Sequence, residues 1–162
     1  GMAGYEPLQE GLAVLAEYLV GGLNRSRLRL LAGRIMAVQS IYQGADFIES
    51  FRLLHDQYNF SQSTAFNIVM RVYRGGGYTK DVVYLRGLMN LLSYLAQDGD
   101  LEMLLLGKVS HEQLSFVEEL QWRKILTPAV LRPRYLDKPE TQHKLNRLRK
   151  GVSVLELTSE ET

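Results

Sequence analysis

The chain is 162 residues long, has a formal net charge of +1 at pH 7 and contains no cysteine. Its 46% hydrophobic and 23% charged residues are typical of a globular protein that is long enough to bury a core. This balance favours neither a nucleic-acid partner nor an acidic one, and the lack of cysteine excludes disulfides, thiolate metal sites and a cysteine nucleophile.

No apolar run approaches the roughly 20 residues that a membrane-spanning helix needs. The N-terminus also lacks the basic start and apolar stretch of a signal peptide, so we expect a cytoplasmic protein without a membrane segment. Gly1 before Met2 is typical of the residue left by tag removal. Met2 is then either a natural start or a boundary inside a longer protein.

Helical spacing dominates the first half of the chain. Leu12, Leu15, Leu19 and Leu23 recur at three- and four-residue steps, which predicts a first helix from about Leu8 to Leu23. Asn24 can cap a second helix. Further helices are expected from Asp46 (a capping box with Glu49), Ser61, Thr79, Leu101 and Ser110 (a capping box with Gln113). The prediction is an all-α fold, a compact domain of about six to eight helices.

The last part of the chain has a different composition. Three of the four prolines fall between Thr127 and Pro139, which predicts an extended arm. A polar helix from Glu140 to Lys150 and a short strand or anchoring tail from Val152 to Leu157 would follow. We therefore expect residues 1–2 to be a tag remnant and start methionine, 3–126 a helical core, and 127–162 the arm, helix and tail of the same domain.

The run Gly75-Gly76-Gly77 allows two interpretations. It lacks the sequence context of a phosphate-binding loop, so it is either a flexible helix stop or a loop that admits an anionic ligand to nearby cations. Asp81 and Tyr84, at the start of the next helix, could hold such a loop in place. The sequence does not decide between these interpretations.

The three histidines give no metal motif. His111-Glu112 resembles the start of a metallopeptidase motif, but the second histidine is absent, so we interpret Glu112 as an ordinary first-turn acid. We expect His55 to be structural and His143 to be solvated. Two groups of basic residues are interpreted as solvated faces; they are Arg25, Arg27, Arg29 and Arg34, and Lys144, Arg147, Arg149 and Lys150.

Glu10 lies in the pentapeptide Gln9-Glu10-Gly11-Leu12-Ala13. On spacing alone it is a first-turn acid favoured by the helix dipole. However, the segments Gly4–Ala13, Phe66-Asn67 and Arg71–Leu85 closely resemble the bacterial family named for its QEGLA motif. That family, labelled flavohemoglobin expression-modulating, is related to the microtubule-associated tyrosine carboxypeptidases of eukaryotes. The resemblance extends from Gly4 to about Leu157.

The resemblance implies a zinc metallopeptidase-like site. In the family, two histidines of an HExxxH helix and the glutamate of the QEGLA helix hold the zinc, and the HExxxH glutamate is the general base. Glu10 is the matching ligand in this sequence. A carboxypeptidase must also bind the terminal carboxylate of a peptide or protein, and Arg71, Arg74, Lys80 and Tyr84 have suitable side chains.

The chain departs from the family pattern because it contains no HExxxH. The family segment with that motif would precede Met2. We therefore expect no zinc and no peptidase activity from this polypeptide alone, and no catalytic residue within it. The first hypothesis is a C-terminal helical part of a QEGLA-family metallohydrolase, which needs an HExxxH-bearing segment or a second copy of the chain. The alternative is a non-catalytic helical interaction or regulatory module.

Overall fold

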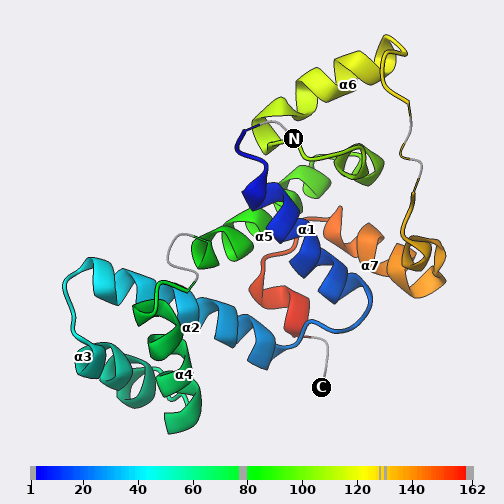
Figure 1. Cartoon of the computed structure of the whole chain (residues 1–162). Helices are drawn as coiled ribbons and strands as arrows, with labels where there is room; N and C mark the ends of the chain where they lie inside the picture. Colours follow the sequence, from blue (N-terminus) through cyan, green and yellow to red (C-terminus); the bar gives the residue numbers. More distant parts are fainter. Residues whose placement is uncertain (1–2, 77–79, 128, 130, 160–162) are drawn as a thin grey trace. The chain divides into compact units, whose positions relative to one another are not determined.

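The computed structural model describes residues 3–76, 80–127, 129 and 131–159. These residues form seven α-helices and no strand, which confirms the predicted all-α fold of six to eight helices (Figure 1). The α-helices are α1 (Glu6–Leu19), α2 (Arg25–Tyr42), α3 (Phe47–Arg52), α4 (Gln62–Tyr73), α5 (Asp81–Ala96), α6 (Leu114–Trp122) and α7 (Pro139–Leu148). Shorter helical turns are Leu53–Gln57, Leu101–Leu105, His111–Gln113, Arg134–Asp137 and Leu155–Thr158. No helix in the described part of the chain is long and apolar enough to cross a membrane.

The chain divides into two compact units. The terminal unit combines Gly1–Asn24 with Arg86–Thr162, and the central unit is Arg25–Leu85. Helix α5 therefore contributes its first residues to the central unit and the rest to the terminal unit. The predicted helix start at Thr79 and the glycine Gly77 lie outside the described residues, as do Gly1 and Met2.

In the central unit, α2, α3 and α4 surround one apolar core. Its buried members are Ala37, Val38, Leu54, Ala65, Ile68, Val69 and Val72. The ring of Phe60 occupies the space beside Gly33 of α2, where an added Cβ would lie 2.8 Å from the ring atom Cζ. A glycine at this position of α2 thus lets the Phe60 ring approach the helix backbone.

Side-chain caps start two helices of the central unit, as predicted. The backbone N–H of Glu49 donates to Asp46 Oδ1 and that of Asp46 donates to Glu49 Oε2, both at 2.8 Å, which forms the expected capping box of α3. Ser61 Oγ accepts from the N–H of Thr64 and begins α4. The single helix expected after Asp46 is instead two pieces, because a π-helical turn from Leu53 to Gln57 follows α3.

Helix α1 of the terminal unit ends at Leu19, four residues before the predicted end at Leu23. Gly21 has a left-handed φ of +82°, which ends the helix, and the N–H groups of Gly22 and Leu23 both donate to the carbonyl of Glu17. This is the usual glycine-dependent way of closing a helix C-terminus. Leu23 is still buried, although it belongs to the segment that follows the helix.

Helices α1 and α5 touch through their backbones. A Cβ on Gly11 would lie 2.3 Å from the carbonyl carbon of Gly87, and a Cβ on Gly87 would lie 1.8 Å from the carbonyl oxygen of Pro7. Neither position can hold any side chain without moving the helices apart. The surrounding leucines, among them Leu15, Leu88 and Leu91, are almost fully buried.

Helix α7 caps the C-terminal end of α1. Lys144 Nζ donates to the carbonyl of Tyr18 at 2.8 Å and lies 5.1 Å from the centre of its ring, and Arg147 Nη1 donates to the Tyr18 hydroxyl at 3.2 Å. A cation at these carbonyls also complements the helix dipole. The interpretation of this basic group as a solvated face is therefore wrong for Lys144 and Arg147.

The C-terminal tail anchors itself on the terminal unit. The predicted strand or anchoring tail from Val152 to Leu157 is not a strand, because it ends in the helical turn Leu155–Thr158. Leu157 is buried, so the segment is an anchor. In its described residues, the arm before α7 contains one helical turn, Arg134–Asp137, with the buried residue Leu136.

We predict that Gly11→Ala and Gly87→Ala each lower the free energy of unfolding by about 3 kcal/mol, because the new methyl group collides with backbone. In an unobstructed helix the same change would stabilise by up to about 1 kcal/mol, so the sign of the effect is diagnostic. Urea denaturation measures it. The control is Gly107→Ala, where the added Cβ meets nothing within 4 Å; an equal loss in that control would contradict the prediction.

We predict a second, pH-dependent effect at Tyr94. Burial, with a contribution from Glu118, raises the pKa of Tyr94 from 10.0 to about 12. As the pH rises, the Tyr94 phenol loses its proton in the unfolded chain before it does so in the folded one. The contribution of Tyr94 to the free energy of unfolding is therefore complete below pH 10 and is lost as the pH rises towards 12. Between pH 9 and pH 11.5, the urea midpoint should fall less for Tyr94→Phe than for the wild type. Tyr42→Phe, at an 83% exposed position, should leave the decline unchanged.

Candidate functional site

Glu10 lies in the first half of α1, next to the glycine that contacts α5. Its side chain is half-buried. The preceding residue, Gln9, donates from Nε2 to the carbonyl of Gly107 at 3.5 Å, which ties the same turn of helix to the segment before α6. Because Gly11 fixes the rotation of α1 against α5, the direction in which Glu10 leaves the helix is also fixed.

The histidines do not join Glu10 in a metal site. His55 belongs to the central unit, where its Nδ1 lies 2.8 Å from the carbonyl oxygen of Phe60. His111 places its ring edge-on to Tyr94, and His143 is exposed on α7. Among the described residues no three His, Cys, Asp or Glu side chains are grouped to hold a metal ion. The described side chains therefore do not fit a zinc ion by themselves.

A buried charge cluster lies in the central unit, around Asp81. This carboxylate is fully buried at the first residue of α5. Arg71, in the last turn of α4, donates from Nε to Oδ2 at 3.2 Å and from Nη2 to Oδ1 at 3.0 Å. Arg34 of α2 places Nη1 3.9 Å from Oδ1. Side chains of α2 and α4 thus meet the buried carboxylate at the start of α5. Arg71 pairs with this carboxylate in bidentate fashion, through two parallel hydrogen bonds.

The cluster stabilises the charged form of Arg71. The hydrogen bonds from Arg71 to Asp81 raise the pKa of the guanidinium above its ordinary value, and the charges of Asp81 and of the Tyr84 side chain act in the same direction. Tyr84 is half-buried in the first turn of α5. The structure therefore groups Arg71 with Asp81, and Tyr84 lies one turn further along α5.

Glycine is required where α4 ends beside this cluster. Gly75 has a φ of +77°, and the N–H of Gly76 donates to the carbonyl of Arg71 at 2.8 Å. A Cβ on Gly76 would lie 2.8 Å from that carbonyl oxygen and 3.1 Å from Arg71 Cγ. The helix-stop interpretation of the glycine run is confirmed for Gly75. Admission of an anionic ligand stays a prediction.

The remaining predicted site residues are on the surface of the central unit. Arg74 is the C-terminal cap of α4 and is exposed, and Lys80 is exposed immediately before α5. Glu10 belongs to the other unit. Sequence reasoning missed Arg34, which it assigned to a solvated face. That interpretation is wrong for Arg34, because its partner Asp81 is distant in sequence and no local spacing indicates the pair.

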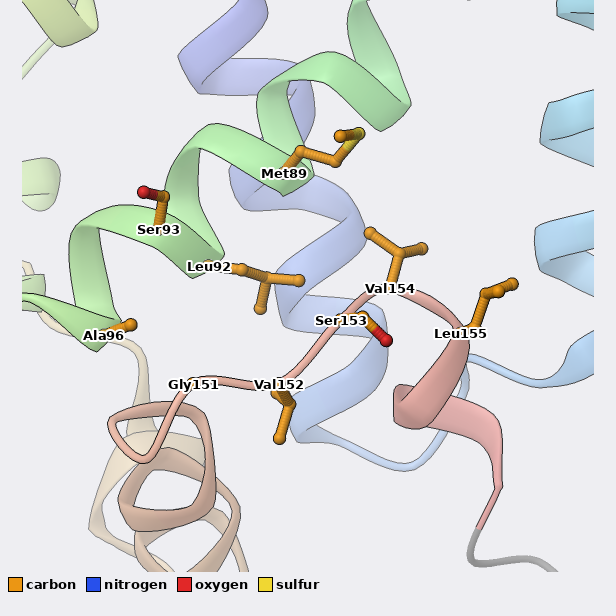
Figure 2. Close-up of a pocket in the computed structure, with 9 residues that line it drawn as sticks. All are labelled: Met89, Leu92, Ser93, Ala96, Gly151, Val152, Ser153, Val154 and Leu155. Atoms are coloured by element: carbon orange, nitrogen blue, oxygen red, sulfur yellow. The ribbon is translucent and has the colours of Figure 1, made fainter.

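Hollows on the surface of the terminal unit include one along α5 and one where α1 begins, and Glu10 lines neither of these. A groove of about 590 Å³ runs along α5 beside the tail, and Figure 2 shows its lining from Met89 to Ala96 and from Gly151 to Leu155. None of its nine lining residues ionises. A smaller cleft of about 290 Å³ lies where α1 begins, with Arg86, Asn90 and His111 in its wall.

Comparison with known proteins gives one family match. The family described as microtubule-associated tyrosine carboxypeptidase matches residues 1–152, nearly the whole chain. No curated protein matches. No solved structure matches either.

We predict that the ion pair between Arg71 and Asp81 responds unequally to truncation of its two partners. Arg71→Ala leaves a buried carboxylate without its bidentate donor and should lower the free energy of unfolding by about 3 kcal/mol. Asp81→Ala leaves two partly exposed cations that water can solvate, so its cost should be about half as large. Urea denaturation of both variants measures the difference; an equal or reversed order would contradict it.

Proposed function

This chain belongs to the family of microtubule-associated tyrosine carboxypeptidases, and we propose that it forms the C-terminal helical part of a zinc carboxypeptidase-like hydrolase of the QEGLA type. The match over residues 1–152 supports the relation to carboxypeptidase-like hydrolases. The observation that carries the proposal is the placement of Glu10, a half-buried carboxylate on a helix whose position is fixed by backbone contact.

We propose that Glu10 is one zinc ligand and that two histidines of an HExxxH-bearing segment complete the set. Carboxylate oxygen is a usual third protein ligand in hydrolytic zinc sites, and such sites need a rigid support. The backbone contact between Gly11 and Gly87 supplies that rigidity for the helix that carries Glu10. The described residues do not hold the metal alone, so no catalytic step is assigned to them.

The central unit carries the candidate contacts for the substrate. A carboxypeptidase recognises the terminal carboxylate of a peptide or protein, and Arg71, Arg74, Lys80 and Tyr84 are the proposed contacts. Arg71 is the best supported of these, because Asp81 orders its guanidinium and hydrogen bonding keeps it charged. Arg74 and Lys80 are proposed from their charge and exposure.

The second candidate is a non-catalytic interaction module, with a second copy of the chain or another protein as its partner. The apolar groove of Figure 2 favours it, since a groove without ionisable side chains suits docking better than catalysis. Zinc content separates the candidates.

We predict that the complete gene product, including the HExxxH-bearing segment, binds one zinc ion per chain and releases C-terminal residues from peptides. Glu10→Ala should lower the zinc content and the activity by at least about tenfold, because a metal ligand is lost. Elemental analysis and a peptide cleavage assay measure the two quantities.

Glu17→Ala, on the same side of α1, is the matched control and should retain both zinc and activity. Full zinc content in Glu10→Ala would contradict the assignment of the ligand. Stoichiometric zinc bound by the present 162-residue chain through Glu10 would contradict the need for a further segment.

A further inference from the structure

The arrangement around Asp81 leaves part of the Arg71 guanidinium available to a ligand. Its contacts with Asp81 use Nε and Nη2, that is, one edge of the planar group. A guanidinium has five N–H donors, so its contacts with Asp81 leave unused the end formed by Nη1 and the second hydrogen of Nη2, as far as the described residues go. The Arg71 side chain is 42% exposed. This end matches the two oxygens of a carboxylate.

The cluster also carries an uncompensated charge. Asp81 is the ion-pair partner of both Arg34 and Arg71 among the described residues. Two guanidinium groups and one carboxylate leave one net positive charge at a site that is half shielded from water. Arg34 is 23% exposed and lies too far from Asp81 for a hydrogen bond, so it acts through its charge.

Asp81 reduces the cost of ligand binding by ordering Arg71 in advance. A free arginine side chain loses about 2 kcal/mol of rotamer entropy when it is fixed. Here the fork to Asp81 fixes the guanidinium before any ligand arrives, and the burial of Asp81 at the start of α5 fixes the carboxylate. Such advance ordering increases affinity without adding a contact.

We propose that Asp81 and Arg34 are positioning residues of a carboxylate-binding site whose direct contact is the outer end of Arg71. The ligand class, the terminal carboxylate of a peptide, rests on the proposed function. One net positive charge and one planar donor pair suit a monoanionic, planar group. A phosphate dianion, which carries more charge and is tetrahedral, fits this site less well.

The test is an NMR titration of the 162-residue chain with N-acetyl-glycyl-alanine, its C-terminal amide, and inorganic phosphate at matched ionic strength. The free carboxylate should bind at about millimolar concentration and shift the Nε–H signal of Arg71. The amide should bind at least about tenfold more weakly. Equal binding of the amide would overturn the proposal, and tighter binding of phosphate would overturn the ligand class.

Asp81→Asn separates positioning from simple charge attraction. This variant adds net positive charge, so a site that works by charge alone would bind the carboxylate more tightly. A positioning role requires the opposite, a dissociation constant raised about fivefold or more. Unchanged or tighter binding would overturn the role of Asp81.

Further variants keep the proposal testable if Asp81→Asn does not fold. Arg71→Lys keeps the charge but loses the fork, and should weaken binding about tenfold. Arg34→Gln should weaken it about threefold through the lost charge. Arg52→Lys, at an exposed position at the end of α3, is the control and should bind as the wild type does. Wild-type binding by both Arg71→Lys and Arg34→Gln would overturn the proposal.

These measurements are independent of zinc and of hydrolysis. Carboxylate binding with the expected variant pattern, in a complete protein that lacks zinc, would contradict only the proposed function. A zinc-dependent peptidase whose 162-residue chain does not distinguish acid from amide would contradict only the present proposal.

Discussion

The backbone contact between Gly11 and Gly87 is the constraint on which the terminal unit depends. Helix axes normally stay 8–10 Å apart because side chains separate them. Here a Cβ at either glycine would overlap main-chain atoms of the other helix, so the contact fixes both the distance and the rotation of α1 against α5. The flanking leucines are then buried on one side, and Glu10 leaves the helix at the edge of the contact. The position of the proposed ligand is thus set by main-chain packing.

The central unit uses a different constraint. Its apolar core holds α2, α3 and α4 together, but the buried carboxylate of Asp81 is what joins the first residue of α5 to α2 and α4. A buried charge is expensive unless it is paired, so this carboxylate specifies one arrangement of its arginines. Both constraints involve α5, which provides Asp81 to the central unit and Gly87 to the terminal unit.

The features that could be predicted from sequence are those determined by near neighbours in the chain. The capping box of Asp46 with Glu49 and the helix stop at Gly75 depend on residues within one turn, and both are present. The pairing of Arg34 with Asp81 depends on how three helices pack, so the sequence suggested a solvated face instead. The contact of Lys144 with the end of α1 could not be predicted for the same reason, because its two partners are far apart in the sequence. Glu10 was found only through its family motif, because its spacing equally suits a first-turn acid.

Stability alone does not explain two arginines at one carboxylate. One bidentate arginine would neutralise Asp81, and a well-packed apolar residue in place of a buried ion pair is often neutral or stabilising. The second cation leaves the cluster with one positive charge in excess, and the anion that we propose would compensate it. Arg71, whose side chain is 42% exposed, is where we propose that such an anion binds. A positive charge in excess at a partly exposed arginine is expected of a binding site, since active sites keep charge that the rest of the fold compensates.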